Sequence, residues 1–339
     1  MFNIRVLSRE DTENLLKIKD VIDVVENVYR SKSEDKATVF PLIFHEFDPG
    51  VADMDIKSGW LKDEEIFGLK LVSWFGENIK KNLPALVGLI MVVDSTTGAP
   101  IGILDGGHIT GIRTGASGSL GAKYLAREDS QTLLMVGTGH VSTFQIAAMI
   151  ELFPKLEKVL LYNPNNLQKA EEMAENISAT LNNDLSIDVK GKVEFIPVSD
   201  IEKATGKSDI IITATPSKEP LIMKEWVKPG THFSCIGADM SGKQEIDANL
   251  FKGARIFTDD TPQSIDVGEI EIPLSLGTMS KDEIAGEIGD IITGKTPGRE
   301  NDEQITIYDA TGTALLDLAT AKLALAQGEK LDIGSTVKL

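Results

Sequence analysis

Apolar residues near the start of the chain follow a helical spacing, and those after it follow the spacing of strands. Within residues 8–34 the apolar positions fall on one face of a helix, and Ser8 with Asp11 gives a helix-start signal. Runs rich in β-branched and aromatic residues follow at 38–47, 66–75, 86–94 and 101–105. The pattern predicts one amphipathic opening helix and then a mainly antiparallel sheet, because no helical segment separates these strands.

The pattern changes at about residue 108. Residues 108–126, "HITGIRTGASGSLGAKYLA", are small and glycine-rich and predict a tightly packed connecting helix. After it, strand-like runs such as "TLLMVG" and "KVLLYN" alternate with helical segments, which is typical of parallel βαβ units. The C-terminal run 305–327 predicts one more strand and a helix that returns to the first domain.

Length and charge narrow the class of protein. A chain of 339 residues is long enough for two domains, each with its own core. The formal net charge of −18 would repel phosphate backbones and acidic lipid headgroups, so we expect neither nucleic-acid nor membrane partners. No run of 18 apolar residues occurs, and the N-terminus lacks a basic leader, so we expect a cytoplasmic protein.

Cysteine and histidine usage gives no sign of a metal. The single cysteine, Cys235, lies in a predicted buried strand and is expected to be an inert core thiol. The four histidines show no HxH or HExxH spacing, and no CxxC pair exists. We therefore expect no metal site.

The stretch "LLMVGTGHVSTFQ", residues 133–145, carries the main cofactor signal. Gly137 would allow a sharp turn after a strand, and Gly139 would let the backbone approach a pyrophosphate at the start of a helix. Ser142 replaces the usual third small residue, so the motif depends on its strand–turn–helix context. Asn163 stands where an acid would read the ribose, which leaves NAD and NADP both open.

Several stretches together resemble the ornithine cyclodeaminase/μ-crystallin family. They occur in the family's order and cover most of the chain: "GLKLVSWFGEN" (68–78), "DGGHITGIRTGASGSLGAKYLAR" (105–127), "VGTGHVSTFQ" (136–145), "TATPSKEP" (213–220), "GTHFSCIGADMSGKQEID" (230–247) and "GRENDEQITIYDATGTALLD" (298–317).

The resemblance implies an α/β protein in which a doubly wound Rossmann domain is inserted in a second, α+β domain. We expect the Rossmann domain at 121–305, and the second domain, for substrate binding and homodimerisation, at 1–120 plus 306–339. Family activities include alanine dehydrogenation, reduction of cyclic ketimines or other imino acids, and ornithine cyclodeamination. The resemblance therefore implies chemistry on a small amino or imino acid without fixing the reaction.

Two cations in apolar surroundings are the predicted substrate ligands. Lys70 lies in the middle of a strand, and a buried ammonium needs an anion, which a substrate carboxylate would supply. Arg113 lies in the small-residue helix and has the bidentate geometry for the same carboxylate. The resemblance assigns this role to the lysine. The alternatives are a strand-edge lysine in water and, for Arg113, a structural salt bridge between helices.

Asp239 follows a predicted strand where the nicotinamide should lie, and it is the predicted proton acceptor. A helix cap or turn residue is the competing interpretation. The predicted cofactor contacts are Thr114, Gly137, Thr138, Gly139, His140, Val141, Asn163, Thr213, Ala214, Thr215, Asp309 and Gly312.

The chain also departs from its relatives around residues 38–60. Leu42 stands approximately where many members have an arginine that binds the carboxylate, and we expect Lys57 to supply the missing charge. Asp53 and Asp55 could equally face a substrate amine. These changes leave the substrate open.

Three functions remain in competition. The leading hypothesis is an NAD(P)-dependent amino-acid dehydrogenase or imino-acid reductase that works by hydride transfer. The second is a cyclodeaminase, a lyase in which hydride leaves and returns within one turnover. The third is a non-catalytic protein that binds NADP or a small ligand.

Overall fold

The computed structural model describes residues 2–189 and 191–339. The chain divides into two compact units: unit 1 comprises Met1–Arg113 and Thr313–Leu339, and unit 2 comprises Thr114–Gly312. The first division falls inside helix α3 (Gly106–Leu125), so that one continuous helix contributes its first residues to unit 1 and its last residues to unit 2.

Unit 1 is built on one mixed sheet. Its strands are β1 (Asn3–Leu7), β2 (Ala37–Val39), β3 (Ile43–Asp48), β4 (Ala52–Leu61), β5 (Ile66–Phe75), β6 (Leu86–Asp94), β7 (Pro100–Asp105) and β16 (Ser335–Lys338). They lie in the order β16-β1-β7-β6-β5-β4-β2, with β3 also paired to β4. Apart from the parallel pair β1 and β7, the described pairs are antiparallel, which confirms the predicted character of the sheet.

The predicted opening helix is two helices, α1 (Arg9–Leu15) and α2 (Ile18–Ser33), so the expectation of one continuous helix was wrong. Leu16 and Lys17 have extended backbone between them. This break lets the neighbouring Leu15, Leu16 and Ile18 all become buried, whereas residues 15 and 16 would point about 100° apart on one helix.

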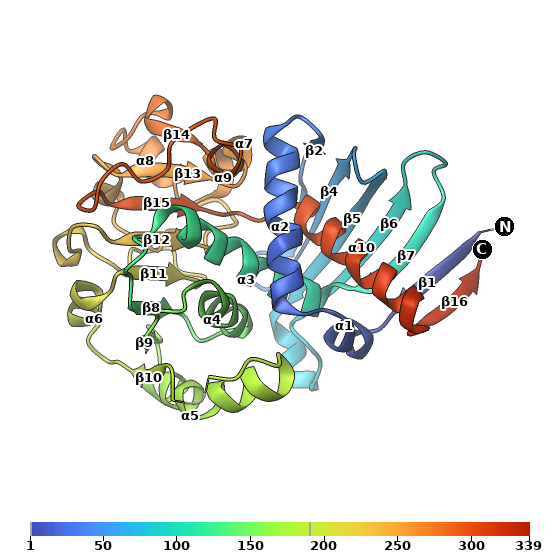
Figure 1. Ribbon diagram of the computed structural model, residues 1–339, viewed down its shortest axis with the longest axis horizontal. Coiled ribbons are helices and arrows are strands. Elements are labelled where there is room, and N and C mark those ends of the chain that lie inside the picture. The colour runs from blue at the N-terminus through green and yellow to red at the C-terminus, as the bar shows by residue number, and fades with distance from the viewer. Residues whose placement is uncertain (1, 190) are drawn as a thin grey trace. The chain divides into compact units, whose positions relative to one another are not determined.

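Helices α2 and α10 (Ala314–Leu331) lie side by side on one face of the unit 1 sheet (Figure 1). Leu315 of α10 lies over Gly59 of β4, and Leu325 lies over Gly102 of β7. The helix therefore crosses the sheet at close range, because the strands present glycines beneath it. A short 3₁₀ helix, η1 (Gly76–Lys81), links β5 and β6.

Unit 2 has a parallel sheet with helices packed around it (Figure 1). Its strands are β8 (Thr132–Val136), β9 (Lys158–Tyr162), β10 (Glu194–Pro197), β11 (Ile210–Thr213), β12 (His232–Cys235), β13 (Arg255–Thr258), β14 (Ile284–Glu287) and β15 (Thr306–Asp309). The order β10-β9-β8-β11-β12-β15-β13-β14 changes direction between β8 and β11. This order is that of a doubly wound sheet, which confirms the predicted Rossmann fold.

The helices of unit 2, besides the end of α3, are α4 (His140–Leu152), α5 (Leu167–Asp184), α6 (Ile201–Lys207), α7 (Thr261–Val267), α8 (Glu271–Ser275) and α9 (Ile288–Ile292), with 3₁₀ turns η2 (Lys224–Trp226), η3 (Ala248–Phe251) and η4 (Lys281–Glu283). The core of this unit joins side chains from the central strands, such as Leu134, Ile211, Phe233 and Ile307. Within the described residues, no helix combines the length and the apolar character needed to cross a membrane.

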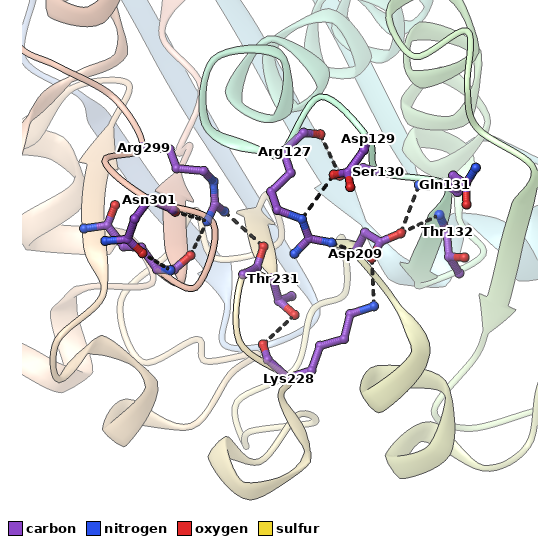
Figure 2. Close-up of polar contacts among 12 residues, drawn as sticks. Arg127, Asp129, Ser130, Gln131, Thr132, Asp209, Lys228, Thr231, Arg299 and Asn301 are labelled. Atoms are coloured by element: carbon purple, nitrogen blue, oxygen red, sulfur yellow. Dashed lines mark hydrogen bonds and ion pairs between the residues drawn. The ribbon is translucent and has the colours of Figure 1, made fainter.

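A polar cluster stands at the amino ends of the unit 2 strands (Figure 2). We call Arg127, Asp209, Lys228 and Arg299 the amino-end cluster. Asp209 accepts from Arg127 Nη2 at 3.0 Å and from Lys228 Nζ at 2.7 Å, and its other oxygen accepts from the Thr132 amide at 3.0 Å. The carboxylate therefore joins the start of β8 to the segments before β11 and β12.

Arg299 of the amino-end cluster is surrounded by acceptors of the protein itself. Its Nε donates to Leu125 O at 2.8 Å, and its Nη2 donates to Gly230 O at 3.1 Å and to Thr306 Oγ1 at 2.9 Å. Its Nη1 donates to the carbonyl oxygens of Asn301 and Gln304. Every nitrogen of this guanidinium thus holds backbone or side-chain groups of unit 2.

Candidate active site

Lys70 lies in the middle of β5 with its ammonium buried. The strand register places it between Lys57 of β4 and Ile90 of β6. Its Nζ lies 2.9 Å from Asp317 Oδ2 and donates to Thr110 Oγ1 at 3.4 Å. Burial, followed by repulsion from the Arg113 charge, lowers the pKa of Lys70 to about 8, and Asp317 acts in the opposite direction.

Arg113 lies in α3 and reaches the same carboxylate. Its Nε donates to Asp317 Oδ1 at 2.9 Å, and its side chain is 6% exposed. The structure therefore brings Lys70 and Arg113 to one point of unit 1. The salt bridge between helices, the structural alternative for Arg113, is present. This salt bridge uses the Nε of Arg113, so the two Nη nitrogens remain available to bind a ligand.

Asp317 is the residue that sequence reasoning missed. It lies in the first turn of α10, and its side chain is fully buried. We call Lys70, Arg113 and Asp317 the cation cluster. The signal was present in the sequence: Asp317 interrupts the apolar run "ALLDLA" just as Lys70 interrupts "FGLKLV". A charge placed among apolar residues predicts a partner in either case.

The other residues predicted near the substrate lie on the same strands. Lys57 faces the same side of the sheet as Lys70, because the two residues are direct partners in the antiparallel pair of β4 and β5. Asp53, Asp55 and Lys57 are every second residue along β4, so their side chains lie on the same face of the sheet. Leu42 is partly exposed between β2 and β3. The substrate roles of these residues stay predictions.

The glycine turn in unit 2 has the geometry of a phosphate-binding turn. Gly137 has φ +110°, and a Cβ there would lie 2.5 Å from Ala214 O, so the turn after β8 and the end of β11 meet only because residue 137 is glycine. Gly139 caps α4 without a side-chain hydrogen bond, and a Cβ there would meet open space. An uncapped, open helix start at the switch point of the sheet fits a dinucleotide pyrophosphate.

Other predicted cofactor residues surround this turn. Asn163, directly after β9, donates from Nδ2 to Thr138 Oγ1 at 2.8 Å. Its Oδ1 accepts from the amides of Asn165 and Asn166, both at 3.0 Å. The Asn163 amide therefore fixes the loop against the glycine turn and presents no charge to a ribose. His140 and Val141 form the first turn of α4, so their backbone belongs to the open helix start.

Thr114 is placed beside α4 by the packing of α3. The Thr114 carbonyl accepts from Gln145 Nε2 at 2.8 Å. A Cβ on the next residue, Gly115, would lie 2.4 Å from Phe144 O, so the small residues of α3 permit this close contact.

The loops after β11 and β12 are joined by a buried acid that the sequence analysis did not single out. Glu245 accepts from the Thr215 amide at 2.6 Å, from Thr215 Oγ1 at 2.7 Å and from the Gly237 amide at 2.9 Å. Thr213, the last residue of β11, and Ala214 precede this link. Glu245 thus fixes two loops at the carboxyl edge of the sheet, where ligands of such folds bind.

Two further buried acids, Glu269 and Asp309, also accept hydrogen bonds from backbone amides near this edge of the sheet. Glu269 accepts from the amides of Glu245 and Ile246 at 2.7 and 2.8 Å, and Asp309 accepts from the Ile270 amide at 3.1 Å. Burial raises the pKa of Asp309 to about 8 and raises that of Glu269 well above its usual range. The Asp309 carboxyl lies in the interior of unit 2, where it accepts a hydrogen bond from the backbone amide of Ile270.

Gly312 and its neighbours are fixed by another buried acid. Asp259 accepts from the Thr311 amide at 3.1 Å and from the Gly312 amide at 2.7 Å. Asp309 and Gly312 therefore end β15 in a loop whose backbone is already held by acids of unit 2. A cofactor role for either residue stays a prediction.

Asp239 lies in the loop after β12 and differs from these acids. Its side chain is 49% exposed, and its Oδ1 lies 2.5 Å from Lys243 Nζ. A carboxylate with access to water can accept a proton and pass it on.

The Cys235 thiol is buried at the end of β12. Burial raises its pKa well above the usual range, which agrees with an inert core thiol.

The fold and the glycine turn define a Rossmann-type dinucleotide-binding protein with a second α/β unit. The chain belongs to the ornithine cyclodeaminase/mu-crystallin family, whose model matches residues 3–328.

Three solved structures show how far the likeness extends. An archaeal alanine dehydrogenase, a dimer with bound NAD, is 32% identical with a TM-score of 0.90, and the match covers 100% of both chains. The Δ1-pyrroline-2-carboxylate reductase of Thermococcus litoralis, in complex with NADH and L-proline, is 32% identical with a TM-score of 0.90, covering 98% of this chain and 100% of that one. The iminosuccinate reductase of Paracoccus denitrificans, in complex with NAD⁺, is 29% identical with a TM-score of 0.89, covering 100% of both.

Proposed function

We propose that this protein is an NAD-dependent oxidoreductase that acts on the CH–NH₂ bond of a small amino acid or the C=N bond of the corresponding imino acid. Similarity along the whole chain to dehydrogenases and reductases of such compounds supports this activity. The single observation that carries the proposal is the convergence of Lys70 and Arg113 on one buried point with hydrogen-bond donors left over.

In this proposal each described group has one task. Lys70 and Arg113 bind the substrate carboxylate and so fix the orientation of the α-carbon, which supplies much of the rate. A nicotinamide dinucleotide, when bound at the glycine turn of unit 2, supplies the hydride acceptor or donor. Asp239 accepts the proton that the amine loses and returns it in the reverse direction.

NAD is the proposed coenzyme. The three similar structures contain NAD, NADH or NAD⁺. In this chain the loop "NPNN" after β9 has no arginine that would bind a 2′-phosphate, and Asn163 is engaged with Thr138. We expect NAD to give the larger kcat/KM of the two coenzymes.

The test is a panel of substrates followed at 340 nm. L-Alanine, L-proline, L-aspartate and L-ornithine are each offered with NAD⁺ and NADP⁺, and Δ1-pyrroline-2-carboxylate and pyruvate with ammonia are offered with the reduced coenzymes. A net absorbance change with at least one substrate is expected. Ammonia release from ornithine without any net change would identify a cyclodeaminase instead, and no reaction at all would favour a binding protein.

Asp239→Asn is the matched variant for this assay. We expect turnover to fall by about 10²-fold or more, since proton transfer by a positioned group contributes this much. Coenzyme binding, followed by quenching of tryptophan fluorescence, should be retained. Unchanged turnover would remove Asp239 from the mechanism without touching the carboxylate site.

We also propose that the protein is a homodimer formed through unit 1. Large apolar side chains that share the sheet face opposite Lys70 are exposed on this unit: Ile43, Phe75, Val87 and Leu89. A patch of this kind is typical of a protein interface, and the similar alanine dehydrogenase is a dimer. Light scattering should give twice the mass of one chain, and Val87→Asp should shift it to the monomer. A monomeric wild type contradicts the proposal.

A further inference from the structure

Asp317 occupies a position that suits a permanent anion. It lies in the first turn of α10, where the helix dipole favours negative charge, and it comes from a segment 204 residues from Arg113. Although burial alone would raise its pKa, the charges of Arg113 and Lys70 hold the pKa of Asp317 below its usual range. The carboxylate is therefore ionised whenever the two cations are present.

The charges of the cation cluster do not cancel. With Lys70 and Arg113 protonated and Asp317 ionised, the three buried groups carry one net positive charge, and the charge of Lys57 on the neighbouring strand acts in the same direction as that of Arg113 by lowering the pKa of Lys70. Such a charge is unfavourable unless a further anion approaches it. One monocarboxylate would bring the cluster to neutrality, whereas without Asp317 the excess would be two charges.

The unused donors lie on the same two cations. Lys70 Nζ forms an ion pair with Asp317 Oδ2 at 2.9 Å and donates to Thr110 Oγ1 at 3.4 Å, so these two contacts do not use all three N–H groups of the ammonium. Arg113 uses its Nε on Asp317, and neither of its Nη nitrogens donates to another residue in 2–189 or 191–339. The Nη edge of a guanidinium matches the two oxygens of a carboxylate.

We infer that Asp317 is a positioning residue of the carboxylate-binding site. It holds Lys70 Nζ and the Nε edge of Arg113 at 2.9 Å each, so that the Nη edge and one ammonium N–H stay directed to the substrate. It acts through these two cations and makes no contact with the reacting atoms. The inference rests on the proposed function for its ligand, but the orientation of Lys70 by Asp317 can be measured separately.

The first experiment needs no turnover. Lysine labelled with ¹³C at Cε is incorporated, and the NMR signal of Lys70 is assigned by its absence in Lys70→Met. In the wild type this signal should titrate near pH 8. In Asp317→Asn its midpoint should move down by about one unit or more, because a neighbouring anion has been removed. An unchanged midpoint overturns the inference, even if the enzyme is active.

The second experiment uses the substrate found in the panel. In Asp317→Asn, KM should rise by about tenfold or more at pH 8 but by less than about threefold at pH 6, where Lys70 regains its proton. A fall in kcat with the same KM at both pH values would mean a merely structural role. Absence of turnover in the wild type would refute the proposed function, and the NMR titration would still decide on Asp317.

Two further variants keep the result interpretable. Thr320→Val removes a buried hydroxyl one turn further along α10 that has no hydrogen-bond partner in the described chain, and it should leave the titration and KM unchanged. Asp317→Glu keeps the charge but moves it by one methylene, so Lys70 should still titrate near pH 8 while KM rises more than kcat falls. If Asp317→Asn does not fold, a normal KM in Asp317→Glu overturns the inference.

Discussion

Arg113 is buried and Arg299 is half-buried, and the two guanidinium groups differ in the acceptors to which they donate. Each nitrogen of Arg299 donates to a carbonyl or hydroxyl oxygen of unit 2. Arg113, among the residues that the structure describes, donates only from Nε, to Asp317 Oδ1. Burial of a cation therefore does not identify a ligand site by itself. The donors that the protein leaves unused make the distinction.

The acids of the two clusters differ in the same way. Asp209 in the amino-end cluster accepts from two cations and from the amides of Gln131 and Thr132. Its role is complete without any further molecule, because it joins backbone segments. Within the described part of the chain, Asp317 contacts side chains only: its Oδ1 accepts from Arg113 Nε, and its Oδ2 forms an ion pair with Lys70 Nζ. The amino-end cluster therefore joins segments of the unit 2 sheet, whereas the cation cluster orients Lys70 and Arg113 toward a further anion.

The largest effect is expected for Lys70→Met. Loss of a buried, charge-assisted contact should lower kcat/KM by about a hundredfold or more, while Arg113 still neutralises Asp317. Steady-state kinetics measure the loss, and circular dichroism with coenzyme binding controls for folding. A change of less than about threefold would place the substrate carboxylate elsewhere.

Arg299→Met should lower the stability of the protein but leave its activity nearly unchanged, the reverse of Lys70→Met. Several carbonyl groups lose their donor, so we expect the free energy of unfolding to fall by about 2–3 kcal/mol, with kcat/KM of the folded enzyme within about twofold of the wild type. Urea unfolding provides the first number, and assays well below the transition provide the second. A large loss of activity without loss of stability would contradict a purely structural role.

The pH dependence of stability sharpens the contrast. The folded pKa of Lys70 is about 8, below the 10.5 expected in the unfolded chain, so the unfolded state binds more protons in this interval. Lys70 therefore makes stability rise with pH between about 8 and 10.5, by up to about 1.4 kcal/mol per pH unit. Urea unfolding at pH 8, 9 and 10 should show this slope in the wild type but not in Lys70→Met. Equal slopes would contradict a buried ammonium.

The smallest effect is expected for Lys228→Met. This lysine is 32% exposed and shares Asp209 with Arg127, so its ion pair is partly screened by water. We expect a loss of less than about 1 kcal/mol and no change in activity. A loss as large as that of Arg299→Met would mean that the amino-end cluster acts as one cooperative unit.

Local patterns in the sequence predicted most of the strands and the glycine turn. Alternating apolar runs and the strand–turn–helix context at 133–145 depend on neighbours a few residues away. The strands β1 and β16 escaped notice because Asn3 pairs with Lys338, at the other end of the chain. The β-branched run at 38–47 predicted one strand, but Pro41 separates β2 from β3, since proline cannot donate to a ladder.

Sequence reasoning found the cations of the candidate site but not the acid between them. A buried Lys70 predicts an anion, yet the pattern does not say whether the anion belongs to the protein or to a ligand. Asp317 lies 204 residues from Arg113 in the chain, so only the fold brings them together. Glu245 was missed for a similar reason, because its partners Thr215 and Gly237 lie in separate loops.

The buried Asp309 carboxyl makes the folding of unit 2 take up a proton near neutral pH. Burial raises its pKa from 3.8 to about 8, and it raises the pKa of Glu245 and Glu269 in the same direction. The unfolded chain has Asp309 ionised near neutral pH, so a hydrogen ion must be taken from the buffer as the native interior closes around this group. Through Asp309, alkaline medium works against refolding and mildly acidic medium assists it.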